Sequence, residues 1–202
     1  MVQLALRRCY PDSYTIKDSS FHDTRARGLL LMAPDGLVDN NIIDYTYLPG
    51  ILMGNEFPFG YANWVRNMTV SNNTLTNTML YSNIGPDSQA VAAIQVGHSS
   101  YFRSNNYAWG MGNENVTIIN NDIDTTYAAG IMINGLLNGV VQNNSINQSH
   151  LKHGADAGLN KNLTAPYAIT IMNSSGITTG SNVVTNPGPY YQADSMDMGV
   201  YP

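Results

Sequence analysis

The 202-residue chain has a single cysteine, few charged side chains and no long apolar run. Because Cys9 stands alone, the chain can form neither an intramolecular disulfide nor a cysteine-rich metal site. A membrane-spanning helix would need a run of about 18 apolar residues, so we expect no membrane partner. Charged residues make up 11% of the chain and the formal net charge is −5. This balance disfavours nucleic acid as a partner.

The remaining composition predicts a folded, extracellular protein. Hydrophobic residues make up 43% of the chain and recur regularly, which argues against disorder. The first eight residues contain too short an apolar segment to be a signal peptide. Seven Asn-x-Ser/Thr sequons nevertheless point to a secreted glycoprotein, with chance occurrence in an asparagine-rich repeat as the alternative. The sequon asparagines are Asn67, Asn72, Asn115, Asn143, Asn147, Asn162 and Asn173.

One motif recurs along the whole chain. It consists of two short segments with alternating apolar residues, joined at a corner that is usually Asn-Asn and followed by a third apolar segment. The clearest copy spans 115–124 and 129–133. Three more copies span 35–44 with 49–53, 67–76 with 92–96 and 138–147 with 167–171, and two weaker copies span 14–21 with 27–31 and 176–183. The corners fall at Ser19, Asn41, Asn73, Asn121, Asn144 and Ser181.

The repeat predicts an all-β fold, a right-handed single-stranded parallel β-helix of about six coils with loop insertions. The shortest repeat spacings, roughly 22 residues, match one coil, and longer spacings add an inserted loop. We expect an irregular N-terminal segment or partial cap over 1–13, the β-helix over 14–186 and an irregular tail over 187–202. Six coils at about 4.8 Å each give a rod of about 29 Å, short for an enzyme of this kind, which suggests that coils are missing before residue 14.

Period-two alternation also predicts which side chains point inward. Predicted inward residues are Val38, Ile43, Ile51, Met53, Val116, Ile118, Ile123, Ile131 and Ile133. One predicted outward column holds His22, Asp44, Thr76, Asp124 and Asn147. A second holds Leu30, Leu52, Gln95, Met132 and Thr170. Because the second column is apolar, it must either lie under inserted loops or bind a partner.

Candidate catalytic residues follow from the chemistry of glycoside hydrolysis, which needs two carboxyl groups about 5 to 9 Å apart. Asp44 and Glu56 flank the same coil and form our predicted pair, with Glu114, Asp122 and Asp124 as further carboxyl groups. A polysaccharide lyase is less favoured, because no coil stacks the acidic cluster that would hold Ca²⁺. We predict no metal and no cofactor. His150 and His153 lack a third ligand and fit a solvated loop better.

Candidate substrate-binding residues are basic or aromatic. His22, Arg25 and Arg27 lie close together, and paired guanidinium groups on one face recognise carboxylates or hydroxyls. A salt-bridged corner formed with Asp23 and Asp44 is the alternative. Trp64 and Trp109 belong to aromatic-rich inserted loops that suit the apolar faces of sugar rings, or that pack onto the rod.

Several of these segments resemble a β-helix glycoside hydrolase group of the pectate-lyase-like type, and most closely the α-1,3-galactosidase family. The resemblance covers about residues 14–80 through Arg25-Ala-Arg-Gly28, Val38-Asp-Asn-Asn-Ile42, Gly50-Ile-Leu-Met-Gly-Asn-Glu56, Trp64 and Asn67-Met-Thr-Val-Ser-Asn-Asn73. It implies cleavage of glycosidic bonds, with Arg25, Arg27, Glu56 and Trp64 in contact with substrate. That family carries an Asp-Asp motif ahead of its Arg-x-Arg-Gly segment, and this chain has no Asp-Asp pair. If the kinship holds, the catalytic coils are absent.

Together these patterns predict a carbohydrate-active β-helix protein whose partner is a poly- or oligosaccharide. A glycoside hydrolase relative, complete or truncated, is the main hypothesis, and a non-catalytic glycan-binding or structural β-solenoid is the alternative. An ice-binding rod needs a regular threonine column, and Thr74, Thr76 and Thr125 do not recur from coil to coil.

Overall fold

The computed structural model describes residues 12–54, 64–80, 92–97, 112–151 and 167–197. All eighteen elements in these ranges are β-strands. Within the same ranges, no helix has the length and apolar character needed to cross a membrane.

The strands form three parallel sheets of six strands each. Sheet A holds β1 (Tyr14–Lys17), β4 (Gly36–Asp39), β7 (Arg66–Ser71), β10 (Asn113–Ile119), β13 (Leu136–Gln142) and β16 (Ser175–Gly180). Sheet B holds β2 (Ser20–Thr24), β5 (Ile42–Thr46), β8 (Thr74–Thr78), β11 (Asp122–Thr126), β14 (Ser145–Asn147) and β17 (Val183–Thr185). Sheet C holds β3 (Leu29–Leu31), β6 (Ile51–Met53), β9 (Ala92–Val96), β12 (Ala129–Asn134), β15 (Tyr167–Met172) and β18 (Ala193–Asp197).

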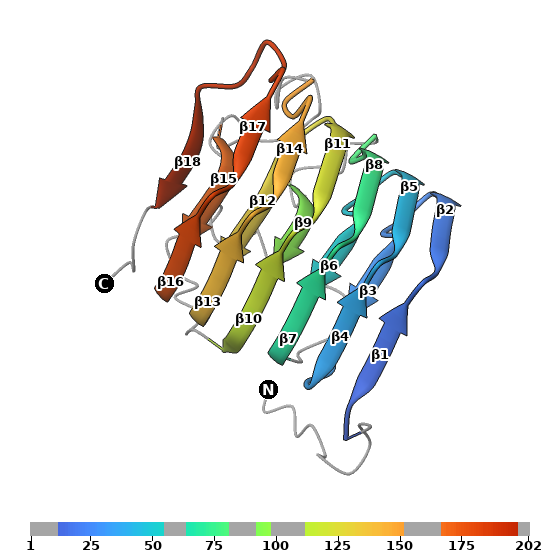
Figure 1. Cartoon of the computed structure of the whole chain (residues 1–202), viewed down its shortest axis with the longest axis vertical. Coiled ribbons are helices and arrows are strands. Elements are labelled where there is room, and N and C mark those ends of the chain that lie inside the picture. Colours follow the sequence, from blue (N-terminus) through green and yellow to red (C-terminus); the bar gives the residue numbers. More distant parts are fainter. Residues whose placement is uncertain (1–11, 55–63, 81–91, 98–111, 152–166, 198–202) are drawn as a thin grey trace, which may run out of the picture.

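Each turn of the chain contributes one strand to every sheet, so the fold is a six-coil parallel β-helix, as predicted (Figure 1). Coil 1 comprises β1 to β3, coil 2 comprises β4 to β6, and the series continues to coil 6 with β16 to β18. Strand β18 lies within the segment that we expected to be irregular, and it pairs in parallel with β15.

The core runs up the middle of the coils. All nine residues predicted to point inward are at most 1% exposed, and they belong to one continuous hydrophobic cluster. At one corner of coils 1 to 5, two consecutive residues face inward, and the first of the two is small. This column holds Gly28, Gly50, Ala93, Gly130 and Ala168. A Cβ atom added at Gly130 would lie 2.8 Å from the side chain of Ile146, so the isoleucine fills the space that glycine leaves.

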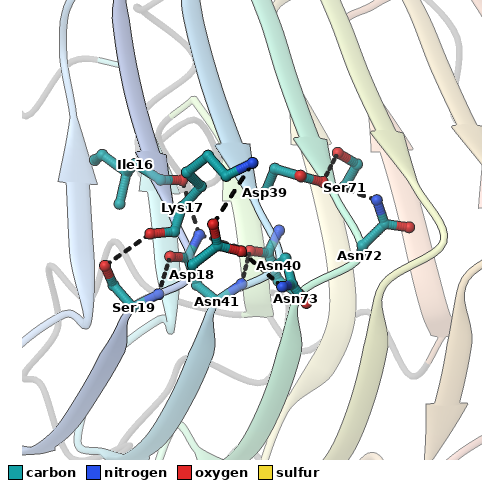
Figure 2. Close-up of polar contacts among 10 residues, drawn as sticks. All are labelled: Ile16, Lys17, Asp18, Ser19, Asp39, Asn40, Asn41, Ser71, Asn72 and Asn73. Atoms are coloured by element: carbon teal, nitrogen blue, oxygen red, sulfur yellow. Dashed lines mark hydrogen bonds and ion pairs between the residues drawn. The ribbon is translucent and has the colours of Figure 1, made fainter.

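The corner between sheets A and B is closed by an asparagine ladder, which we define as Asn41, Asn73, Asn121, Asn144 and Asn182 (Figure 2 shows its first part). The Nδ2 atom of each member donates to the Oδ1 atom of the next, at 2.9 to 3.0 Å. The same Oδ1 atoms accept the backbone N–H of the preceding coil, beginning with Ser19. The second hydrogen of each Nδ2 bonds a carbonyl of the coil before.

The ladder leaves no polar atom of its buried members unsatisfied, which is what buried amides require. Four of the six predicted corners are members of the ladder, and Ser19 takes the corresponding place in coil 1, where its backbone N–H donates to Asn41. The sixth was wrong by one residue, because Asn182 occupies the ladder position. Ser181 has a φ of 54° and takes the preceding left-handed position, which Asp18, Asn40, Asn72, Asn120 and Asn143 occupy in the other coils. A residue with a small polar side chain suits that backbone conformation.

The second outward column forms in the predicted register, from Leu30 through Leu52, Gln95 and Met132 to Thr170 on sheet C. Its members from Leu52 onward are at most 2% exposed. This column is therefore shielded from solvent and is not a free surface.

Candidate functional site

The outward face of sheet B carries the polar column that the sequence predicted. His22, Asp44, Thr76, Asp124 and Asn147 stand in register on successive strands, and Thr185 continues the column into coil 6. His22 and Asp44 are therefore neighbours across coils 1 and 2. Parallel strands are about 4.8 Å apart, which sets the spacing along the column.

Asp44 is held by the next coil. Its Oδ1 atom accepts hydrogen bonds from Thr76 Oγ1 at 2.6 Å and from Asn77 Nδ2 at 2.9 Å. Burial pushes the pKa of Asp44 upward, but these two hydrogen bonds, the backbone N–H of Tyr45 and the nearby His22 outweigh it and hold the pKa below its usual value. Asp44 is thus ionised near neutral pH.

An ionised carboxylate suits the role of nucleophile or base, whereas a general acid must keep its proton. Asp44 also links coil 2 to coil 3, so it contributes to the fold whatever its chemical role. Asp124 has a comparable structural contact, because its Oδ1 atom accepts from Asn147 Nδ2 at 2.8 Å. It lies two strands from Asp44 in the same column, or roughly 10 Å along the rod.

The basic residues of coil 1 lie on β2, which pairs with the strand of Asp44, or directly after it. His22 Nδ1 lies 2.9 Å from Asp23 Oδ2, and both side chains are largely exposed. Arg25 and Arg27 follow β2 in a bend rather than in an extended strand, and Arg25 is exposed whereas Arg27 is half-buried. The His22–Asp23 contact is not the predicted corner, and ion pairs of the two arginines with Asp23 and Asp44 stay a prediction.

Two tyrosines that the sequence did not single out complete the surface. Tyr45 is 52% exposed and Tyr47 is 39% exposed. Tyr45 lies opposite Asp23, between the paired residues His22–Asp44 and Thr24–Thr46. The backbone N–H of Tyr47 donates to Thr24 O at 3.0 Å, which places Tyr47 beside the end of β2. We call this group the coil 1–2 face, and it consists of His22, Asp23, Arg25, Asp44, Tyr45 and Tyr47.

Tyr45 has an unusual backbone conformation for its type. Its φ is 55°, in the left-handed region that bulky residues rarely adopt. The equivalent positions of the other coils hold Asp23, Asn77, Thr125, Gln148 and Asn186. A left-handed residue costs about 1–2 kcal/mol unless it is glycine or a short polar residue that bonds locally. An exposed aromatic at such a position marks a candidate functional residue.

The other predicted site residues lie elsewhere or outside the described ranges. Glu56 and Trp109 belong to segments that the structure does not describe. Trp64 is half-buried, and its indole lies against Gly112, where an added Cβ would overlap the ring. Packing therefore occupies one side of Trp64. The catalytic and substrate-binding roles of all these residues stay predictions.

His150 corrects one expectation. We expected a solvated loop, but the side chain is 4% exposed, with Nδ1 3.1 Å from the hydroxyl of Ser149. Its ring makes an edge contact with Tyr191, at 6.1 Å between centroids. The imidazole therefore packs under the C-terminal segment. His153 lies outside the described residues, and the described ranges contain no group of three His, Cys, Asp or Glu side chains placed to hold a metal ion.

Comparison with known proteins identifies the family of the chain. The sequence fits the family model described as "Right handed beta helix region" over residues 8–197. No curated protein matches the chain.

Proposed function

Because the chain belongs to the family of right-handed β-helix regions, we propose that it is a carbohydrate-binding β-helix protein and that the coil 1–2 face is its binding surface. The observation that carries the proposal is Tyr45, which is solvent-exposed although its backbone is left-handed. The fold does not need an aromatic there, since the other coils use non-aromatic polar residues at the same place. A contact with a ligand would explain why a tyrosine occupies this position.

The chemistry around Tyr45 suits a sugar. The ring offers an apolar face, and two neighbours come from the same coil: Asp44, which is half-buried, and Tyr47, which is exposed. His22, Asp23 and Arg25 add hydrogen-bond donors and acceptors from coil 1. Mostly rigid strands hold these groups, so little ordering would be needed on binding. A poly- or oligosaccharide is therefore the proposed ligand class.

The test uses Tyr45→Asn, which installs the asparagine that coil 3 carries at the equivalent position. Because asparagine accepts a left-handed backbone more readily than tyrosine, we expect the free energy of unfolding to rise by about 0.5–1 kcal/mol. Affinity for a glycan identified on an array should fall at least tenfold, as is common for a central aromatic contact. Calorimetric titration and denaturant unfolding measure the two effects separately.

Tyr190→Asn is the matched control, because Tyr190 is also exposed but precedes β18 at the other end of the rod. It should leave glycan affinity unchanged. If Tyr45→Asn binds as tightly as wild type, or if both variants lose affinity equally, the coil 1–2 face is not the binding surface.

Glycoside hydrolysis is the second candidate, and the ionised Asp44 favours it. The α-1,3-galactosidase resemblance assigns substrate contacts to Arg25 and Arg27, which flank this face. Asp124, two strands along the column, could supply the second carboxyl group at roughly the separation of inverting enzymes. Turnover of aryl glycosides that disappears in both Asp44→Asn and Asp124→Asn would support hydrolysis. Binding without turnover in the wild type would reject it and leave the binding proposal standing.

A further inference from the structure

The structure separates the sequon asparagines by what their side-chain amides do. Six of the seven lie in the described ranges, and Asn162 does not. Four of these six donate hydrogen bonds from Nδ2 to a neighbouring coil: Asn67 to Asp35, Asn72 to Asp39, Asn115 to Asn67 and Asn147 to Asp124. The fifth, Asn173, is 8% exposed, which leaves no room for an attached sugar.

Asn143 differs from the other five. It occupies the left-handed position just before the ladder, with a φ of 56°, and its side chain is exposed. Its backbone N–H donates to Gly180 O at 3.1 Å, so the main chain is fixed. Among the described residues, its side-chain amide has no hydrogen-bond partner. The next residue, Asn144, points inward into the ladder and is 1% exposed, so a substituent on Asn143 would leave the ladder intact.

We propose that Asn143 is an N-glycosylation site of the secreted chain. In the transfer, the Asn143 Nδ2 atom forms a bond to C1 of the first sugar of a lipid diphosphate-linked oligosaccharide. The bond from C1 to the diphosphate oxygen breaks, the lipid diphosphate leaves, and Nδ2 loses one proton. Ser145 supplies the hydroxyl that the acceptor sequence requires. The glycan then projects from the corner between sheets A and B.

The fold offers a matched pair for the test. Asn120 occupies the same left-handed position one coil earlier and is also exposed. Its sequence, Asn120-Asn-Asp122, lacks only the hydroxyl of a sequon. Asp122 and Ser145 are register partners on β11 and β14. Ser145→Ala removes the sequon at Asn143, and Asp122→Ser creates one at Asn120. The double variant should therefore carry the glycan on Asn120 instead of Asn143, without altering the ladder.

The experiment measures site occupancy in the full chain secreted from eukaryotic cells. Peptide N-glycosidase in ¹⁸O-labelled water converts each glycosylated asparagine to a heavy aspartate, which peptide mass spectrometry locates. We expect the label at Asn143 in the wild type, its loss in Ser145→Ala, and its appearance at Asn120 in Asp122→Ser and in the double variant. Thermal melting of the deglycosylated variants should match the wild type, which checks that folding is unchanged.

Protein isolated from the cells that naturally produce it supplies the second measurement, and it should carry a sugar on Asn143. An unmodified Asn143 in that material, or in the secreted wild type, would overturn the proposal. So would a double variant in which Asn120 stays unmodified, because an exposed asparagine in a sequon at this corner would then not suffice as an acceptor.

Discussion

The asparagine ladder makes a quantitative prediction at its centre. Replacing Asn121 by alanine removes the Oδ1 atom that accepts both the backbone N–H and the Nδ2 of Asn73, at 3.1 and 2.9 Å. Asn73 is fully buried, so two donors are left without an acceptor or water. Each unsatisfied buried group costs about 1–3 kcal/mol. The expected loss of unfolding free energy is therefore about 2–6 kcal/mol, a large part of the 5–15 kcal/mol typical of a domain.

Chemical denaturation followed by far-ultraviolet circular dichroism measures this loss. In a chain of this size each kcal/mol corresponds to roughly 3 °C, so the midpoint of thermal unfolding should fall by about 6–18 °C. Asn120→Gly is the matched control, because it changes the adjacent exposed asparagine to the residue best suited to its left-handed backbone. Its stability should stay within about 0.5 kcal/mol of wild type.

A second comparison tests whether burial sets the magnitude. Asn182 ends the ladder and is only half-buried, so water can reach the groups that Asn182→Ala would expose. The loss of unfolding free energy in Asn182→Ala should be clearly smaller than in Asn121→Ala. If Asn121→Ala costs less than about 1 kcal/mol, or no more than the two comparison variants, the amide ladder is not what stabilises this corner.

Two further predictions concern the core and the acid limit of stability. Gly130→Ala should destabilise the protein by about 1–3 kcal/mol, because the new Cβ lies 2.8 Å from Ile146, and Ile146→Val in the same chain should recover part of the loss in a denaturation series. Hydrogen bonds from Ser71 and Asn72 hold the pKa of Asp39 below its usual value. The ionised Asp39 therefore stabilises the fold above about pH 4, and this stabilisation is lost as the pH falls through the lowered folded-state pKa. Asp39→Asn should flatten the fall in melting temperature below pH 4, and an unchanged acid limb would contradict this assignment.

The fold could be predicted because two periodicities agree in this sequence. Alternation within strands fixed the inward residues, and the asparagine corners fixed the length of each coil. The error at Ser181 has a simple cause: the corner consists of two residues, the left-handed one and the ladder one, and serine suits the first as well as asparagine does. Only the inter-coil hydrogen bond to Asn182 distinguishes them.

The candidate site could be predicted only in part. The column from His22 to Asp44 followed from register, but the exposure of Tyr45 and Tyr47 did not. In sequence, Tyr45 sits among alternating apolar residues, and nothing marks it as outward. The signal that could have found it is its place after the outward column, where the other coils all have a polar residue, twice an asparagine. His150 was misjudged because its burial depends on a contact with Tyr191, about forty residues away.

The outward columns show how stability and function can share one surface on this rod. Many outward polar groups already bond the next coil, as Asp44 bonds Thr76, so a substitution there disturbs the fold and any ligand contact together. Tyr45 is different because its ring is exposed and its backbone is strained, so stability and binding should change in opposite directions when it is replaced. Loss of binding at Asp44 is therefore ambiguous evidence for a site, whereas loss of binding in a more stable Tyr45→Asn protein can be attributed to the ligand contact alone.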